Sequence, residues 1–398
     1  MATDLDLDLD IDLLDPAFYA DLDGMHAAFT EMRKAGPVWR AERNGLWAIV
    51  GHAAVIDVER RARTFSSATG YRSFHSPGED NMIAQDNPAH AEQRRLVADR
   101  FTPKGVPAFE GKIRALVVEL VDRVAQAGEV EVVDALAAQL PCRLTAHLLG
   151  FPEDRWRDIK SWSERLMRYD AIHSDTEAFL GMMGAIQEFS EVLNPLVESR
   201  RSEPVDDLVS VWATSEIGGC PMADHTIMNE TGLFISGGAE TTRTVIARGL
   251  AKLAEHPDQW EAMADDPSLV ARAVEELIRW VTPLNNFFRT ATEDTTVAGT
   301  PIVAGERVIL LYPSANRDEG MFADPFVFDV AREPNPHVAF GFGPHVCLGM
   351  HLARLELRIL FKELTRRLTN LRVVEAPELE ANIFATAVKS MRLAADPR

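Results

Sequence analysis

The segment from Phe340 to Gly349 constrains this chain more than any other feature. It reads Phe-Gly-Phe-Gly-Pro-His-Val-Cys-Leu-Gly, and it places the thiol of Cys347 in a turn bounded by glycines, just before a helical run from Met350 to Glu356. Glycines let backbone N–H groups approach the sulfur, a nearby phenylalanine excludes water, and the dipole of the following helix stabilises an anionic ligand. The pattern therefore predicts a cysteinate that binds a haem iron.

The two other cysteines, Cys142 and Cys220, stand alone in the sequence. No Cys-x-x-Cys pair is present, so a zinc or iron–sulfur site would have too few ligands. We expect both to be packing residues. Three unpatterned cysteines also favour a reducing compartment over a disulfide scaffold.

The cysteine segment resembles the haem-binding loop of cytochromes P450, with Phe340, Gly343, Cys347 and Gly349 on the family pattern. The resemblance runs from about residue 18 to about residue 391. It implies a soluble, bacterial-type monooxygenase with haem b as its cofactor and Cys347 as the axial iron ligand. It also implies that one atom of O₂ is inserted into a C–H bond of an apolar small molecule.

A second motif, Gly-Gly-Ala-Glu-Thr-Thr from Gly237 to Thr242, interrupts a long apolar helical run. Each glycine in a helix interior costs about 1 kcal/mol relative to alanine, so the close approach of a flat group is one reason for the pair. The resemblance implies that Glu240 and Thr241 are the acid–alcohol pair that delivers protons during catalysis. It also implies that Gly238 contacts the haem.

Haem carries two propionates, so an apolar pocket that holds it needs cations at one edge. His90 and Arg94 lie one helical turn apart, behind the helix-start signal of Pro88. The resemblance adds Arg289 and His345 to this set, and it puts Phe340 beside the cofactor.

Glu276 and Arg279 place opposite charges at i and i+3, which alone indicates only an ordinary ion pair. The resemblance implies that Arg332 completes a structural triad with them. We expect this triad to support folding and haem retention without taking part in the chemistry.

Periodicity predicts a mainly α-helical chain with a minor β region, which agrees with the P450 fold and its haem between a long central helix and the cysteine-loop helix. We expect a flexible acidic tail over residues 1–17 and a single haem domain over residues 18–398, because the tail repeats like charges with no basic partner. The clearest helical segments are Ile113–Val124, Thr226–Leu253 and Ser268–Trp280, and the strand-like ones are Val38–Val50, Thr296–Val303 and Arg307–Leu311.

Charge and hydropathy exclude several partners. The 41 basic and 61 acidic residues give a net charge of −20, which opposes nucleic-acid binding. No apolar run near 20 residues and no signal peptide are present, so we expect a cytoplasmic protein without a membrane anchor. With no flavin or ferredoxin module in view, we expect electrons from a separate ferredoxin and ferredoxin reductase. A basic patch for an acidic ferredoxin would comprise Arg94, Arg95, Arg100, Lys104 and Arg354.

The candidate substrate pocket is overwhelmingly apolar. Its residues are Tyr71, Phe74, Met182, Phe234, Leu284, Phe287, Ile383 and Phe384, with Met167, Tyr169, Phe179, Met183, Ile235 and Phe288 as further candidates. In detail the chain is similar to actinobacterial P450s that hydroxylate the terminal methyl of sterol and methyl-branched lipid side chains.

Three alternatives stay open. One is a secondary-metabolite or terpenoid hydroxylase of the same fold. Another is a non-catalytic haem-thiolate sensor or carrier. The pair of Glu240 and Thr241 argues against it, because a carrier does not need residues that deliver protons. The third is a peroxide-using hydroxylase, which tends to replace that pair with a clamp for a substrate carboxylate.

Overall fold

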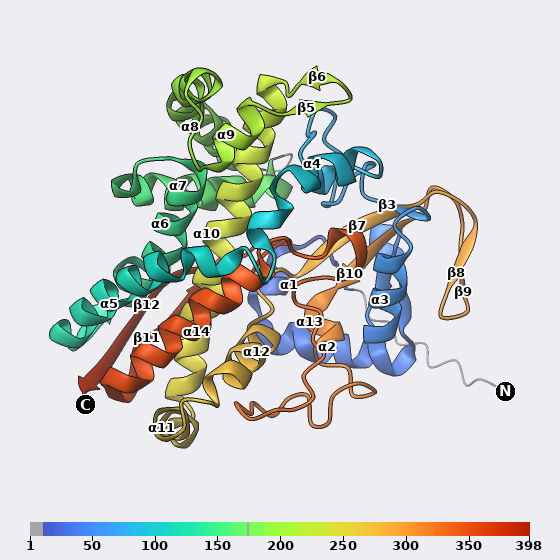
Figure 1. Ribbon diagram of the computed structural model, residues 1–398. Helices are drawn as coiled ribbons and strands as arrows, with labels where there is room; N and C mark the ends of the chain where they lie inside the picture. Colours follow the sequence, from blue (N-terminus) through green and yellow to red (C-terminus); the bar gives the residue numbers. More distant parts are fainter. Residues whose placement is uncertain (1–10, 173–174) are drawn as a thin grey trace.

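The computed structural model describes residues 11–172 and 175–398. In these residues helices dominate, as the sequence predicts (Figure 1). The α-helices are α1 Pro16–Ala20, α2 Leu22–Ala35, α3 His52–Arg60, α4 Ala89–Val97, α5 Glu110–Ala127, α6 Gln139–Leu149, α7 Trp156–Met167, α8 Thr176–Ser202, α9 Leu208–Ala213, α10 Asp224–Ala254, α11 Pro257–Asp265, α12 Val270–Val281, α13 Tyr312–Ala315 and α14 Met350–Arg367.

The strands form a minor β region. They are β1 Val38–Ala41, β2 Leu46–Ile49, β3 Phe65–Ser66, β4 Glu129–Glu131, β5 Glu216–Ile217, β6 Cys220–Pro221, β7 Asn286–Ala291, β8 Thr295–Val297, β9 Thr300–Ile302, β10 Arg307–Leu311, β11 Leu368–Leu379 and β12 Val388–Pro397. The largest sheet has the order β1-β2-β10-β7-β3, and a second sheet has the order β11-β12-β4. The two short hairpins are β5-β6 and β8-β9.

Helix α10 is the axis of the molecule and crosses its centre in Figure 1. It packs against α6, α7 and α12, and it buries side chains on most of its circumference, including Ile235, Ile246 and Leu250. A helix that is buried on most of its circumference lies in the interior of a large domain. The helical core around α5, α6, α10, α12 and α14 therefore holds the site, while the five-stranded sheet lies beside it with α2 and α3.

The predicted strand segments fold as turns and short strands. The range Val38–Val50 divides into β1 and β2, which pair antiparallel, and Arg307–Leu311 is strand β10. Gly299 and Gly305 both have positive φ, at 86° and 87°, and both lie in turns beside β9. The conformational freedom of glycine makes these turns possible.

The predicted flexible tail, residues 1–17, lies partly outside the described residues. From Ile11 onward the chain is packed: Leu13 is fully buried, and its N–H donates to Asn44 Oδ1 at 2.9 Å. Asp12 forms an ion pair with Arg43 at 3.2 Å. The prediction is therefore wrong for residues 11–17, because their polar partners come from the turn after β1, which local sequence does not show.

Cys220 also departs from expectation. Cys142 is buried in the helical core, as predicted, but Cys220 is exposed in the β5-β6 hairpin. Two-stranded hairpins of this length bury little. Among the described residues, we find no helix with the length and apolar character that crossing a membrane requires.

Candidate functional site

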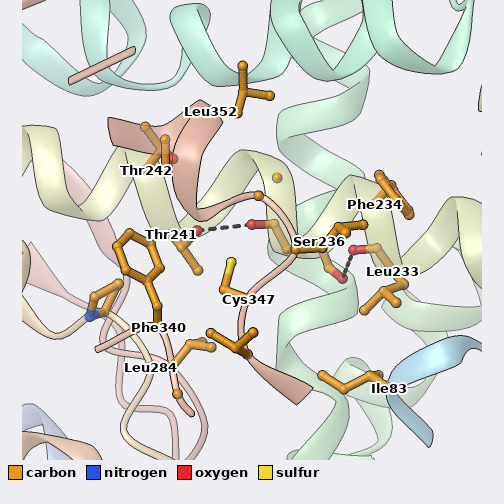
Figure 2. Close-up of a pocket in the computed structure, with 18 of the residues that line it drawn as sticks. Ile83, Leu233, Phe234, Ser236, Thr241, Thr242, Leu284, Phe340, Cys347 and Leu352 are labelled. Carbon is orange, nitrogen blue, oxygen red and sulfur yellow. Dashed lines mark hydrogen bonds between the residues drawn. The ribbon is translucent and has the colours of Figure 1, made fainter. Parts of the chain in front are cut away.

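A deep cavity separates α10 from the loop that carries Cys347 (Figure 2). The empty space inside it, counted together with the open solvent at its mouth, is about 1720 Å³. Most of its lining is apolar. The apolar lining residues include Met82, Ile83, Phe101, Leu144, Leu148, Met167, Leu233, Phe234, Val245, Leu284, Phe287, Phe340, Leu352 and Phe384. This lining suits a largely apolar ligand.

The loop around Cys347 is held open by two glycines in the left-handed region, Gly341 and Gly343, each with φ of 69°. A Cβ on Gly343 would lie 2.4 Å from the carbonyl oxygen of Glu59, so no larger residue fits there. The N–H of Cys347 donates to the carbonyl of Phe340 at 2.8 Å, which closes the turn. This geometry turns the Cys347 side chain into the cavity, where it stays accessible although protein encloses it.

Opposing effects act on the Cys347 thiol. Burial raises its pKa above the ordinary value, while the N–H groups of Gly349 and Met350 and the guanidiniums of Arg94 and Arg354 favour the thiolate. The N–H groups belong to the start of α14, so the helix dipole acts in the same sense. A bound cation at the sulfur would tip this balance, because metal ligation deprotonates a thiol.

On the opposite wall, α10 presents Gly237 and Gly238. A Cβ on Gly237 would meet no atom within 4 Å, whereas a Cβ on Gly238 would lie 2.8 Å from Thr145 Oγ1 on α6. Both glycines line the cavity. The position with open space for a side chain is therefore Gly237, while Gly238, which we expected at the cofactor, lines the same cavity and also allows α6 to pack closely.

Glu240 and Thr241 lie in different surroundings. Thr241 lines the cavity across from Cys347, and its Oγ1 donates to the Gly237 carbonyl at 2.9 Å (Figure 2). Glu240 is 1% exposed and does not line the cavity; it pairs with Arg243 and accepts from Ser163 at 3.4 Å. Burial is the largest influence on Glu240 and raises its pKa to about 7. The carboxyl thus lies behind the helix, and only the alcohol of the predicted pair faces the cavity.

The predicted propionate contacts gather at one edge of the cavity. His90, Arg94 and His345 all line it, and the two histidine rings lie 4.0 Å apart. Arg94 donates to the Val346 carbonyl at 2.7 Å. Arg289 is buried behind them and does not line the cavity, but its charge lowers the pKa of both histidines.

This edge fits an anionic ligand. Burial, the largest influence, acts together with neighbouring cations to lower the pKa of His90 to about 4 and of His345 to about 2. His90 Nε2 is buried and has no hydrogen-bond partner among the described residues. A negatively charged group placed here would favour protonation of the two histidines and would give His90 Nε2 a hydrogen-bond partner. The donors present, a cavity-facing thiol opposite a bare glycine with cations at the edge, therefore fit a haem with its propionates.

The three residues of the expected structural triad, Glu276, Arg279 and Arg332, contact one another beside the chain that leads into the cysteine loop. Glu276 and Arg279 are both fully buried and lie 2.7 Å apart, and Arg332 reaches the same carboxylate at 3.2 Å. Arg279 also donates to the carbonyls of Asn316 and Pro325. The triad therefore joins α12 to the chain that leads into the cysteine loop.

The predicted pocket residues divide into two groups. Five of the eight line the cavity, namely Tyr71, Phe234, Leu284, Phe287 and Phe384, as does the further candidate Met167. The other three, Phe74, Met182 and Ile383, do not. Phe74 stacks on Tyr169 beside a smaller depression, and Ile383 belongs to the core under the five-stranded sheet.

Most of the further candidates also do not line the cavity. Phe179 and Met183 are exposed on α8, at 43% and 47%, while Met182 is buried on that helix. Tyr169, Ile235 and Phe288 likewise lie outside the lining. A helix shows the same periodicity whichever neighbour it packs against, so spacing alone does not separate pocket from core.

Sequence reasoning missed three charged residues of the lining: Glu59, Arg72 and Glu356. Glu59 accepts from the Tyr312 hydroxyl at 2.7 Å, and burial raises its pKa to about 7. Burial raises the pKa of Glu356 to about 8. The only local signal was for Arg72, an arginine set among aromatic residues.

The proposed basic patch is smaller than the sequence predicts. Arg94 faces the cavity, Arg100 pairs with Asp206, and Arg354 pairs with Glu275 and lies over the Phe340 ring. In residues 11–172 and 175–398, Arg95 and Lys104 are the members that are exposed without an acidic partner.

Comparison with known proteins agrees with this architecture. The cytochrome P450 family model matches residues 17–383. A steroid C26-monooxygenase of Mycobacterium tuberculosis is 42% identical over 392 residues, which cover 97% of both chains. The steroid C26-monooxygenase of Mycolicibacterium smegmatis is 41% identical, over 97% of this chain and 96% of that protein. Linalool 8-monooxygenase of Pseudomonas putida is 32% identical, over 97% of this chain and 99% of its own length.

Solved structures give the same result. A Mycobacterium marinum cytochrome P450 in complex with pseudoionone superposes with a TM-score of 0.90 at 32% identity, covering 96% of this chain and 98% of that one. A Bacillus megaterium cytochrome P450 in complex with testosterone has a TM-score of 0.84 at 30% identity, and the match covers 93% of this chain and 97% of that one.

Proposed function

The chain belongs to the cytochrome P450 family of monooxygenases, and we propose that its substrate is a sterol or a methyl-branched lipid, hydroxylated at a terminal methyl group of the side chain. The observation that carries this proposal is the 42% identity to a steroid C26-monooxygenase over 97% of both chains. The apolar cavity supports it, because a long hydrocarbon needs an apolar lining.

The residues around the cavity have separate tasks in this proposal. Haem, when bound, supplies the activation of O₂. Cys347 would provide its sulfur ligand, His90, Arg94 and His345 would hold its propionates, and Gly237 would leave room for its face. Thr241 would position the proton that the reaction consumes. The apolar walls would hold the substrate and exclude bulk water.

Electron supply completes the proposal. We infer that a ferredoxin, itself reduced by a ferredoxin reductase, docks near Arg95 and Lys104, on the side of the protein that carries α4 and the residues after it. Complementary charge would steer an acidic ferredoxin to this side despite the net charge of −20.

Two measurements test the function. The reduced protein with carbon monoxide should show the absorption band typical of a thiolate-ligated haem, and Cys347→His should abolish it. With a ferredoxin system, the protein should convert a sterol to a product oxidised at the end of the side chain, identified by mass spectrometry. A band that persists in Cys347→His would contradict Cys347 as the haem ligand. Turnover of terpenoids but not of sterols would contradict the proposed substrate class.

A terpenoid hydroxylase is the second candidate. It is favoured by the 32% identity to linalool 8-monooxygenase and by the TM-score of 0.90 to the pseudoionone complex. Titration of the ferric protein with steroids and terpenoids side by side would separate the two.

A further inference from the structure

Arg72 is a charged residue in an otherwise apolar part of the cavity. It is only 6% exposed and contributes to the lining. Its guanidinium carbon lies 4.3 Å from the ring centre of Phe384, 5.0 Å from that of Tyr169 and 5.3 Å from that of Tyr71. The three rings hold the guanidinium in one place.

Most of the N–H groups of Arg72 form no hydrogen bond to a described residue. Nε donates to the Tyr71 hydroxyl at 3.1 Å, and Nη1 is buried without a hydrogen bond to any described residue. Nη1 lies 3.7 Å from Asp170 Oδ2, which is also buried and unpartnered within the same set of residues. Nη2 also forms no hydrogen bond to a described residue and, unlike Nη1, is not a fully buried atom, so a ligand oxygen in the cavity that accepts from this charged donor would be strongly favoured.

The positive and negative side chains around Arg72 are equal in number. Arg307 donates to the carbonyls of Arg72 and Ser73, which adds a second cation. Asp170 accepts from the Ser73 N–H at 2.8 Å, and Glu79 accepts from the Tyr71 hydroxyl. Two cations thus face two carboxylates. A ligand carboxylate would add an uncompensated charge, whereas a neutral oxygen would use the free donors without one.

We propose that Arg72 forms a subsite for a neutral ketone or hydroxyl oxygen at the end of the substrate remote from the oxidised carbon. Its contacts come from Tyr71, Tyr169, Asp170, Arg307 and Phe384, and none comes from the loop that carries Cys347. The proposal rests on the proposed function: a sterol oxidised at its side chain carries its ring oxygen, on carbon 3, at the opposite end. Arg72 would then fix the depth and direction of the substrate.

Matched ligand pairs test the subsite in the haem-loaded protein. One pair is a steroid with a ketone at carbon 3 and its 3-deoxy analogue, and the other is pseudoionone and the hydrocarbon that lacks its carbonyl oxygen. The wild-type protein should bind each ketone about 10- to 100-fold more tightly than its partner, as hydrogen bonds to charged groups allow. Arg72→Met should reduce this ratio to about twofold, with the hydrocarbon affinities nearly unchanged.

Two further probes sharpen the test. Arg72→Lys retains the cation with a different donor geometry and should show an intermediate ratio. A steroid carboxylate at carbon 3 should bind more weakly than the ketone; tighter binding that Arg72→Met removes would overturn the choice of a neutral oxygen. The carbon monoxide band and the melting temperature report whether each variant is folded.

The failures are distinguishable. If neither steroid binds but pseudoionone shows the Arg72-dependent preference, the proposed substrate is wrong and the subsite stands. If the wild-type protein prefers neither ketone over its hydrocarbon, the subsite is overturned even if sterols are turned over. That measurement needs no variant, so it holds if substitutions at Arg72 prevent folding.

Discussion

Thr241 and Glu240 are neighbours in sequence, but α10 turns their side chains about 100° apart. Only the hydroxyl of Thr241 faces the cavity, and because it donates to the Gly237 carbonyl, its lone pairs remain available to accept from water or substrate. The carboxyl of Glu240 is paired with Arg243 behind the helix. Proton delivery from Glu240 would therefore require a change of partner, whereas Thr241 is already in position.

We expect Thr241→Ala to keep substrate affinity within about twofold, while the product formed per O₂ consumed falls by about tenfold or more. Proton transfer by a positioned side chain typically raises a reaction rate by about 10²- to 10⁴-fold, so its loss should be large. The missing O₂ equivalents should appear as hydrogen peroxide. Parallel measurement of O₂ uptake, peroxide and product checks this.

Thr241→Ser is the matched control, because it keeps the hydroxyl and should keep most of the coupling. Equal coupling in wild-type, Ala and Ser proteins would remove Thr241 from proton delivery. Loss of haem in the Ala variant alone would show that the residue is structural.

At the scale of elements, the buried pair of Glu276 and Arg279 joins α12 to the chain before the cysteine loop. Glu276→Ala leaves the fully buried guanidinium of Arg279 without its carboxylate, and we expect a loss of about 3–5 kcal/mol in the free energy of unfolding. Haem content should fall as well, because the loop loses its support. Urea unfolding and the ratio of haem to protein measure both effects.

The exposed pair of Glu31 and Lys34 is a matched control for that substitution. It has the same i,i+3 spacing and the same 2.7 Å separation, but its side chains are 39% and 64% exposed. Glu31→Ala should cost less than about 1 kcal/mol. Equal losses in the two variants would mean that burial of the Glu276 pair has no special role.

A second element-scale contact joins α10 to the short turn Met82–Ala84 beside the cavity. Glu230 is fully buried, accepts from the Met82 N–H at 2.7 Å, and has its pKa raised to about 8 by burial. A raised pKa on an acid means that the folded state binds more protons than the unfolded state between about pH 4.5 and pH 8. Stability should therefore fall as pH rises through this window.

Glu230→Gln removes the titration but keeps an acceptor for the Met82 N–H. We expect the wild-type free energy of unfolding to fall relative to that of the variant by about 3–4 kcal/mol between pH 5 and pH 8. Urea unfolding across that range measures the difference. A difference that stays constant with pH would show that Glu230 ionises normally in the folded protein.

Local patterns predicted the elements well and the site only in part. The cysteine loop and the start of α4 are motifs of neighbouring residues, so Cys347 could be proposed from its own segment, and His90 and Arg94 from the resemblance of theirs; all three line the cavity. Asp12 and Arg72 could not, because what decides their role is a partner far away in the chain. Gly237 and Gly238 show the same limit, since only the packing of α6 tells which one faces open space.

At the scale of the whole molecule, a net charge of −20 should repel an acidic ferredoxin except where local cations dominate. Arg95 and Lys104 are exposed and, within the described part of the chain, lack acidic partners, so the attraction depends on few residues. Screening acts over about 10 Å at 0.1 M salt, so the effect of these two cations should be largest at low salt.

We expect the double substitution Arg95→Glu and Lys104→Glu to raise the KM for an acidic ferredoxin about tenfold or more at low ionic strength, with kcat at saturation nearly unchanged. The difference from wild type should shrink toward twofold at 0.5 M salt, because steering between charged surfaces falls steeply with ionic strength. Lys34→Glu on α2 changes charge on another element and should alter KM less than twofold. If it raised KM as much as the double substitution, net charge rather than a local docking surface would govern the encounter, and a KM difference that persisted at high salt would point to contact packing at Arg95 and Lys104 instead of steering.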